Sequence, residues 1–178
     1  VPPHGKMGAA LTAMKRVRPD KNILTIAGDG GAYAIGLGET TSAALRNENV
    51  TMFVMNNTVF GMTGGQLAPT TMLGQKTAST PAGRNFVDNG ENTDVFKLMK
   101  GMDIAYLART SVTSPANINR TKKAVRKAIE KQQAGKGFSL VEVLVPCPTN
   151  WHMSPVDSMK HIDEVVSKVY ELGEVIDR

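Results

Sequence analysis

The sequence predicts an α/β fold in which a mainly parallel sheet lies between helices on both of its faces. Short apolar runs alternate along the chain with longer segments of helical periodicity, the pattern of strand-helix-strand units. The apolar runs are apolar on both faces, which is typical of strands buried in a parallel sheet. They lie at 22–27, 50–56, 103–109 and 138–145. At 178 residues the chain fits one domain, 1–178.

Helices are expected between and after these strands. Pro19 stops the first helix, and Ser114 and Pro115 supply the cap and the first residue of the fourth. The expected ranges are 5–18, 33–47, 93–101, 115–134 and 155–175. A loop rich in Gly, Thr and Pro runs from about Thr58 to Asn92. Loops of that length are usually functional or disordered.

The composition is that of a soluble globular protein, with 41% hydrophobic and 21% charged residues. No apolar run approaches the roughly 20 residues that cross a bilayer, and the start lacks the layout of a signal peptide. The single cysteine, Cys147, excludes an internal disulfide and suits a reducing compartment. We therefore expect a cytoplasmic protein with no membrane partner.

The net charge of +5 does not indicate a nucleic-acid partner. Much of the positive charge lies in the helix expected at 115–134, on the face opposite its apolar residues, and this is typical of a solvated helix face. Aromatic residues make up only 5% of the chain, too few to supply stacking platforms among those lysines.

Polar side chains follow two neighbouring strands at the points where they end. Asp29 lies in "TIAGDGGAYAIG", and Asn57 lies in "FVMNNTVFGMTGGQ", one crossover later. Parallel strands end at the same edge of a sheet, so these side chains should face one crevice. Carboxylate and amide oxygens are suitable ligands for Mg²⁺, and phosphate oxygens complete its coordination shell. Because Gly28, Gly30 and Gly31 allow close backbone approach, the pattern predicts a magnesium-diphosphate site.

Two other interpretations of this turn compete with the magnesium-diphosphate site. Asp-Gly pairs are common in tight turns that bind nothing, and Asp29 by itself does not exclude this. The second motif and the loop after it count against a simple turn. A dinucleotide-binding turn fits less well, because Tyr33 occupies the position that needs a third small residue.

These residues carry a resemblance to a known family. "GDGGAYAIG" followed by "NN" is similar to the thiamine diphosphate motif, and "VMNNTVFGMTGGQLAPTT" resembles the beta subunit of the 2-oxoacid:ferredoxin oxidoreductases of the 2-oxoglutarate and 2-ketoisovalerate types. The similarity extends over most of the chain, including "HG" at residues 4–5, "LRN" at 45–47 and "PCPTNW" at 146–151. The resemblance implies a three-layer thiamine diphosphate-binding fold.

The resemblance also implies roles for single residues. It implies that Mg²⁺ is held by the side chains of Asp29 and Asn57 and by the carbonyl of Val59. The other implied cofactor-binding residues are Gly28, Gly30, Gly31 and Asn56 around the diphosphate, and Gly61, Met62 and Thr63 along the cofactor. His4 would lie near the diphosphate or the substrate, with a frayed terminal histidine as the alternative. No residue of this chain is assigned a catalytic role beyond that candidate.

Members of this family carry a CxxC-containing segment near the N-terminus that helps to hold an iron-sulfur cluster, and nothing of that kind precedes Val1. Cys147 matches the family's late cysteine ligand. One thiolate cannot hold a four-iron cluster, so we expect a 4Fe-4S cluster in the complete protein but none in this chain, which is interpreted as a fragment. The family's activating glutamate belongs to the alpha subunit, and Glu39 is not expected to replace it.

The implied function is the oxidative decarboxylation of a 2-oxoacid to an acyl-CoA, with electron transfer to ferredoxin. Its expected partners are the alpha subunit, further gamma or delta subunits, ferredoxin, the 2-oxoacid, coenzyme A and a second copy of this domain. Two alternatives stay open: a thiamine-dependent decarboxylase or synthase that transfers no electrons, and a non-catalytic binding subunit.

Overall fold

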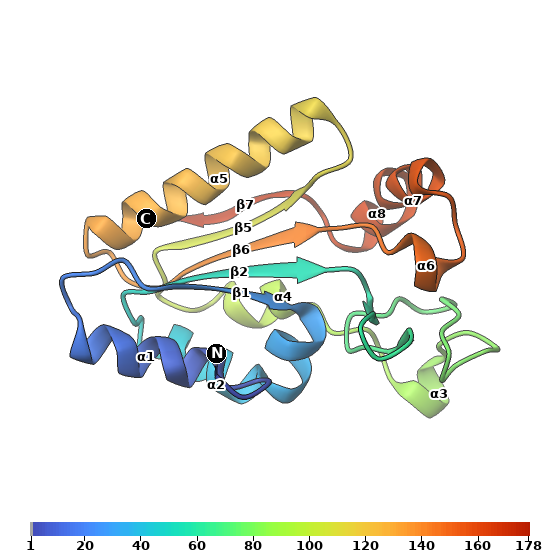
Figure 1. Cartoon of the computed structure of the whole chain (residues 1–178), viewed down its shortest axis with the longest axis horizontal. Helices are drawn as coiled ribbons and strands as arrows, with labels where there is room; N and C mark the ends of the chain where they lie inside the picture. The colour runs from blue at the N-terminus through green and yellow to red at the C-terminus, as the bar shows by residue number, and fades with distance from the viewer. Residues whose placement is uncertain (1) are drawn as a thin grey trace.

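A five-stranded sheet forms the centre of the protein, in a computed structural model that describes residues 2–178 (Figure 1). The strand order is β1-β2-β6-β5-β7. Strands β1, β2, β6 and β5 run parallel, and β7 runs antiparallel to β5. Their bounds are β1 Leu24–Gly28, β2 Thr51–Asn56, β5 Tyr106–Ser111, β6 Ser139–Leu144 and β7 Gly173–Asp177. The mainly parallel sheet is confirmed.

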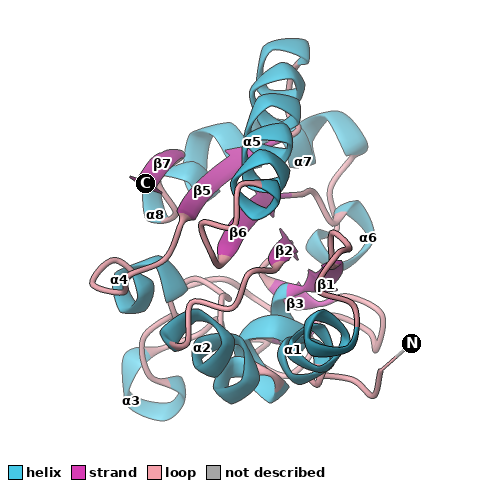
Figure 2. Cartoon of the chain, turned by 90° about the vertical axis from the view of Figure 1, so that its left-hand side faces the viewer, coloured by secondary structure: helices cyan, strands magenta, loops and turns pink. Residues whose placement is uncertain are grey.

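Helices cover both faces of this sheet, as the views along and across it show (Figures 1 and 2). On one face lie α1 (Met7–Val17), α2 (Leu37–Leu45) and α4 (Val95–Met99), and on the other lies α5 (Pro115–Gln133). The Ser114 side chain accepts a hydrogen bond from the Asn117 N–H at 3.2 Å, so the predicted cap of α5 is confirmed.

The sheet separates the two larger of three buried apolar clusters. Leu11 of α1 and Phe96 of α4 pack with strand residues such as Val54 on one face. On the other face Ala124 and Ala128 of α5 pack against strand residues including Phe53, Tyr106 and Val141. This second layer does not cover the edge strand, because Ile26 of β1 remains 68% exposed. The expectation that every strand is buried on both faces is therefore wrong for β1.

The C-terminal segment differs from the sequence-based expectation. The predicted helix over 155–175 is confirmed for 155–169, where α7 (Pro155–His161), the π-helical η2 (Ile162–Val166) and α8 (Ser167–Val169) follow one another without a break, but the chain then returns as β7. Gly173 adopts a φ of +151°, a conformation that favours glycine, and it opens the strand. Ile176 then points into the core, where it is 8% exposed. Burial of one strand face outweighs the helical propensity of the last turn.

The long loop after β2 folds into a lobe beside the carboxyl ends of the strands (Figure 1). It contains the two-stranded β3 (Val59–Phe60) and β4 (Gln66–Leu67) and the short helix α3 (Phe86–Asn89). Arg84 is 6% exposed and donates hydrogen bonds to the backbone carbonyls of Ala68, Pro69, Thr71, Asn89, Gly90 and Glu91. One buried guanidinium thus joins the two ends of the lobe.

The helix expected from residue 33 begins earlier than expected. It starts at Gly30, as the π-helical η1 (Gly30–Ile35), and continues as α2 after Gly36.

Among residues 2–178, the structure contains no helix with the length and apolar character that a bilayer crossing requires.

Candidate cofactor site

A cavity of about 460 Å³ lies at the carboxyl ends of β1 and β2. The two strands are paired neighbours, with Gly28 opposite Met55, so the turns that follow them lie side by side. His4 and all of the predicted cofactor-binding residues except Asn56 line this cavity, together with two residues that the sequence did not indicate. The lining residues are His4, Gly28, Asp29, Gly30, Gly31, Met55, Asn57, Val59, Phe60, Gly61, Met62 and Thr63.

The Asp29 carboxylate lies at the bottom of this cavity and is 2% exposed. The Thr70 hydroxyl donates a hydrogen bond to its Oδ2. No Lys, Arg or His of residues 2–178 lies within 4 Å of it to form an ion pair. Burial raises the pKa of Asp29 to about 6, against the opposing effect of the Thr70 hydrogen bond. A buried carboxylate without a cationic neighbour is suited to binding a metal cation.

Asn56 and Asn57 form two successive turns, and each turn is stabilised by a hydrogen bond to the asparagine side-chain oxygen. The Oδ1 of Asn56 accepts a hydrogen bond from the Thr58 N–H at 3.0 Å, and the Oδ1 of Asn57 accepts one from the Val59 N–H at 3.3 Å. Thr58 adopts a φ of +61°, which this local bonding stabilises. An amide oxygen has two lone pairs, so Asn57 keeps one for a second partner in the cavity.

The glycines around Asp29 differ in the space that lies beside them. A Cβ on Gly28 would meet nothing within 4 Å and would extend into open space. A Cβ on Gly30 would come within 2.2 Å of the Phe60 ring, so the turn packs tightly beneath the loop. A Cβ on Gly31 would lie 3.3 Å from the His4 ring. The turn therefore leaves room for a ligand beside Gly28 and closes against the protein at Gly30.

Cys147 lies just after β6 and is half-buried. Its Sγ accepts a hydrogen bond from the Asn150 Nδ2 at 3.1 Å, and the same amide donates to the Gly61 carbonyl at 3.2 Å. One side chain thus connects the cysteine with the loop that lines the cavity. Among residues 2–178 there is no group of three or more His, Cys, Asp or Glu placed to hold a metal ion.

Glu39, which the sequence analysis placed outside the site, lies outside it. Glu39 forms an ion pair with Lys6 and does not line the cavity, and Lys6 lowers its pKa. The rings of His161 and Trp151 meet edge to face at 5.3 Å. Trp151 packs on the cluster around Leu144 and Tyr170, and its indole N–H donates to the Asn57 carbonyl at 3.1 Å. It therefore supports the asparagine turn from behind.

Sequence reasoning missed the polar layer beneath the cavity. Glu142 and Arg109 are 1% and 3% exposed, face each other on neighbouring strands, and form an ion pair of 2.6 Å. The signal was present in the sequence, because each is a charged residue inside an otherwise apolar run, "LVEVLV" and "IAYLA" followed by Arg. Phe60 and Thr70 carried no comparable signal, since both lie in the loop.

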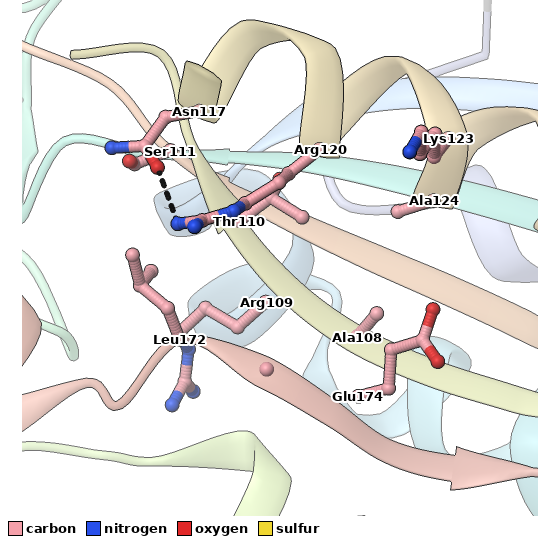
Figure 3. Close-up of a pocket in the computed structure, with 11 residues that line it drawn as sticks. Ala108, Arg109, Thr110, Ser111, Asn117, Arg120, Lys123, Ala124, Leu172 and Glu174 are labelled. Carbon is pink, nitrogen blue, oxygen red and sulfur yellow. Dashed lines mark hydrogen bonds between the residues drawn. The ribbon is translucent and has the colours of Figure 1, made fainter. Parts of the chain in front are cut away.

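A second cavity, of about 370 Å³, lies on the α5 face of the sheet between α5, β5 and β7 (Figure 3). Apolar side chains such as Ala108, Ala124 and Leu172 line it, and Arg120 lies across its upper part, bonded to Asn117 at 3.1 Å. It contains none of the motif residues and is separated from Asp29 by the sheet. We therefore assign the site to the cavity at the ends of β1 and β2.

Comparison with known proteins shows which family the chain resembles. The chain is 37% identical over 176 residues to ketoisovalerate oxidoreductase subunit VorA of Methanothermobacter thermautotrophicus, a match that covers 98% of this chain and 37% of that protein. It is 39% identical over 162 residues to 2-oxoglutarate synthase subunit KorB of Archaeoglobus fulgidus, covering 90% of this chain and 56% of the relative. The chain thus spans about half or less of the curated relatives it matches.

The fold is shared with a solved structure, 2-oxoglutarate:ferredoxin oxidoreductase from Magnetococcus marinus with 2-oxoglutarate, coenzyme A and succinyl-CoA bound. The TM-score is 0.76 at 22% identity, and the match covers 98% of this chain and 63% of that one. The family profile described as "Thiamine pyrophosphate enzyme, C-terminal TPP binding domain" matches residues 2–143. This chain therefore belongs to the thiamine pyrophosphate enzymes and contains their C-terminal cofactor-binding domain.

Proposed function

We propose that this chain is the thiamine diphosphate- and magnesium-binding part of a 2-oxoacid:ferredoxin oxidoreductase. The observation that carries the proposal is the cavity in which Asp29, Asn57 and the Val59 segment meet beside Gly28. Asp29 and Asn57 would hold Mg²⁺ through their side chains, and Val59 through its carbonyl. Gly28, Gly30, Gly31 and the Asn56 turn would shape the space for the diphosphate.

The donor set supports magnesium on chemical grounds. Mg²⁺ takes hard oxygen ligands, usually one or two carboxylates together with phosphate oxygens and water. The cavity offers one carboxylate, one amide oxygen and one carbonyl, which leaves coordination positions for a diphosphate. The buried charge of Asp29 has no cationic neighbour within 4 Å among the described residues, and a bound divalent ion would be that neighbour.

The remaining lining residues would orient the cofactor in the cavity. Gly61, Met62 and Thr63 line the cavity together with the glycine turn, and His4 is exposed and lies beside Gly31. When it is bound, thiamine diphosphate supplies the nucleophilic carbon that adds to the 2-oxoacid carbonyl. The contribution of this chain is to anchor the diphosphate and to fix its direction. Met62 is fully exposed here, so part of the cofactor's wall would come from a partner.

The overall reaction proposed for the complete protein converts a 2-oxoacid and coenzyme A to an acyl-CoA and carbon dioxide, and two electrons pass to ferredoxin. The names of the VorA and KorB relatives support the ketoisovalerate and 2-oxoglutarate classes as substrates. Cys147 would be one ligand of a 4Fe-4S cluster in the complete protein. Its bond to Asn150, which also holds Gly61, supports a short path between cluster and cofactor.

Assembly with other chains is part of this proposal. The alpha subunit would supply the catalytic glutamate, because no carboxylate other than Asp29 lines the cavity among the described residues. A second copy of this domain would cover the edge strand, where Leu24 and Ile26 are 45% and 68% exposed. We infer a cytoplasmic location from the single cysteine.

The proposal is tested by titrating thiamine diphosphate into the chain calorimetrically, with and without Mg²⁺, and repeating the titration with Asp29→Ala. Binding that needs both Mg²⁺ and Asp29 supports the assignment, whereas equal affinity in the variant contradicts it. Formation of acyl-CoA with reduction of ferredoxin in the assembled complex separates the oxidoreductase from a thiamine-dependent decarboxylase that transfers no electrons.

A further inference from the structure

Glu142 lies beneath the cofactor cavity without lining it and makes three side-chain contacts. It is 1% exposed. Its Oε2 accepts a hydrogen bond from the Tyr33 hydroxyl at 2.8 Å, and its Oε1 accepts one from the Asn56 Nδ2 at 3.2 Å and one from the Arg109 Nε at 2.6 Å. Both neutral donors are buried, Tyr33 at 2% and Asn56 at 1% exposure. The carboxylate is therefore fully satisfied inside the protein.

Arg109 balances this charge from a fixed position. Its Nη2 donates to the Asp94 Oδ1 at 2.6 Å, and its Cζ lies 3.9 Å from the centre of the Phe96 ring. Because two carboxylates and an aromatic face hold the guanidinium, it cannot turn away from Glu142. The pair fixes Glu142 from the side opposite Asn56.

The stability of the fold alone does not require a charge at this position. Leu140 and Leu144 precede and follow Glu142 on the same face of β6, and both are 0% exposed. Replacing a buried ion pair with apolar residues of similar size is often neutral or stabilising. A buried polar network in which every member is hydrogen-bonded holds the bonded groups in one arrangement. Glu142 therefore has a role in arrangement that a leucine could not supply.

The groups that Glu142 bonds belong to the two turns of the site. Tyr33 lies on η1, four residues after Asp29, and Asn56 directly precedes Asn57. We propose that Glu142 is a positioning residue, which ties the helix after Asp29 to the asparagine turn and so sets the distance between the two metal ligands. This inference rests on the proposed binding of Mg²⁺ and diphosphate by Asp29 and Asn57.

The charge of Glu142 favours a cation in the same cavity. Among residues 2–178, the carboxylates of Asp94 and Glu142 share one buried cationic partner, Arg109, and the Asp29 carboxylate has none within 4 Å. When the three carboxylates Asp29, Asp94 and Glu142 are ionised, Arg109 balances one negative charge, and two negative charges remain. A divalent cation at Asp29 compensates that excess, whereas a neutral ligand does not.

The test uses two variants that leave the cavity wall unchanged and one control. Tyr33→Phe removes one bond to Glu142 and keeps the ion pair, and Glu142→Gln removes the charge and keeps the shape. Thr51→Val is the control. The hydroxyl of the buried Thr51 accepts a hydrogen bond from the Gln132 side chain at 3.1 Å. Thr51 lies at the other end of β2, about 16 Å from Asn56. It loses a buried hydrogen bond without touching the site.

Two readouts are taken: the affinity for thiamine diphosphate with Mg²⁺ by calorimetry, and amide hydrogen exchange at Thr58 and Val59 without cofactor. We expect Tyr33→Phe and Glu142→Gln each to weaken binding about tenfold, and the double variant to be no weaker than Glu142→Gln alone. Exchange at Thr58 and Val59 rises more than the loss of global stability explains. Thr51→Val lowers stability and changes neither readout at the site.

The inference is overturned if affinity follows global stability in all three variants, or if Thr58 and Val59 exchange as in the wild type. Should Glu142→Gln fail to fold, Tyr33→Phe decides, because it keeps the pair with Arg109. If the wild-type chain binds no cofactor even in complex with its partner subunits, the proposed function fails, and the exchange arm still tests whether Glu142 holds the asparagine turn.

Discussion

The Thr70 hydroxyl donates a hydrogen bond to the Asp29 carboxylate, although 41 positions separate the two residues in the chain. This bond joins the long loop after β2 to the turn after β1, and both groups are buried. The loop is therefore part of the cofactor site and not only a connection between strands.

Asp29→Asn is expected to stabilise the cofactor-free chain and to abolish magnesium-dependent binding. The pKa of Asp29 is raised from 3.8 to about 6, chiefly by burial. The unfolded chain therefore ionises first as the pH rises, and stability falls between pH 4 and pH 6. Above pH 6 the loss is constant at about 3 kcal/mol, since one pKa unit is about 1.4 kcal/mol.

Denaturant unfolding at pH 4.5 and pH 7.5 measures this effect. The variant should gain up to about 3 kcal/mol over the wild type at pH 7.5 and clearly less at pH 4.5. A variant that is less stable than the wild type at pH 7.5 would show that another group already neutralises the Asp29 charge.

Thr70→Val is expected to weaken magnesium-dependent cofactor binding about 5- to 20-fold at pH 7, since one hydrogen bond to a charged group contributes about 1.5 kcal/mol. The hydroxyl bond lowers the pKa of Asp29, so its loss makes protons stronger competitors for the carboxylate. The defect should shrink at pH 8.5. Thr70→Ser keeps the hydroxyl and serves as the control, and an equal defect in both variants would exclude the hydrogen bond as the cause.

Gly28→Ala and Gly30→Ala are expected to fail in different ways. The added methyl at Gly28 enters open space, so stability stays within about 0.5 kcal/mol while cofactor affinity falls. The methyl at Gly30 collides with the Phe60 ring, so unfolding becomes easier by about 1–3 kcal/mol. Thermal unfolding and calorimetric titration of both variants separate the effects. Equal stability losses would contradict the described packing of the turn.

Arg84→Met is expected to loosen the loop and, through it, the support of Asp29. Arg84 donates to the carbonyls of Pro69 and Thr71, on either side of Thr70, as well as to carbonyls at 89–91. Among residues 2–178 its loss leaves the buried Thr71 carbonyl without a donor, at a cost of about 1–3 kcal/mol, whereas the Pro69 carbonyl keeps the Thr93 N–H. Limited proteolysis should cut between 68 and 91 faster than in the wild type. Unchanged cleavage would show that other contacts hold the lobe.

The sequence predicted the part of the site that follows from strand order. Asp29 and Asn57 could be brought together because parallel strands end at one edge of a sheet, and the structure lines one cavity with both. Thr70 and Arg84 could not be found in this way, because their contacts depend on how a long loop closes. Glu142 contradicts the apolar pattern of its strand, and only its partners on three other elements explain it.

The same limit applied to the fold. The central strands were predictable from their apolar runs, whereas β7 was not, because "GEVIDR" has too few apolar residues to distinguish an edge strand from the end of a helix. The pairing of β7 with β5 depends on the burial of Ile176 and on the bond of 2.6 Å from the Tyr106 hydroxyl to Glu174. Neither contact can be seen from local sequence.

The central claim is that Asp29, Asn57 and the Val59 carbonyl hold a divalent cation together with the cofactor's diphosphate. A crystal structure of the chain grown with thiamine diphosphate and Mn²⁺, recorded at the manganese edge, tests it most directly. The account predicts one anomalous peak in direct contact with the Asp29 carboxylate, the Asn57 Oδ1 and the Val59 oxygen, with diphosphate beside Gly28. Cofactor density without a metal at Asp29, or a metal bound elsewhere, would contradict it.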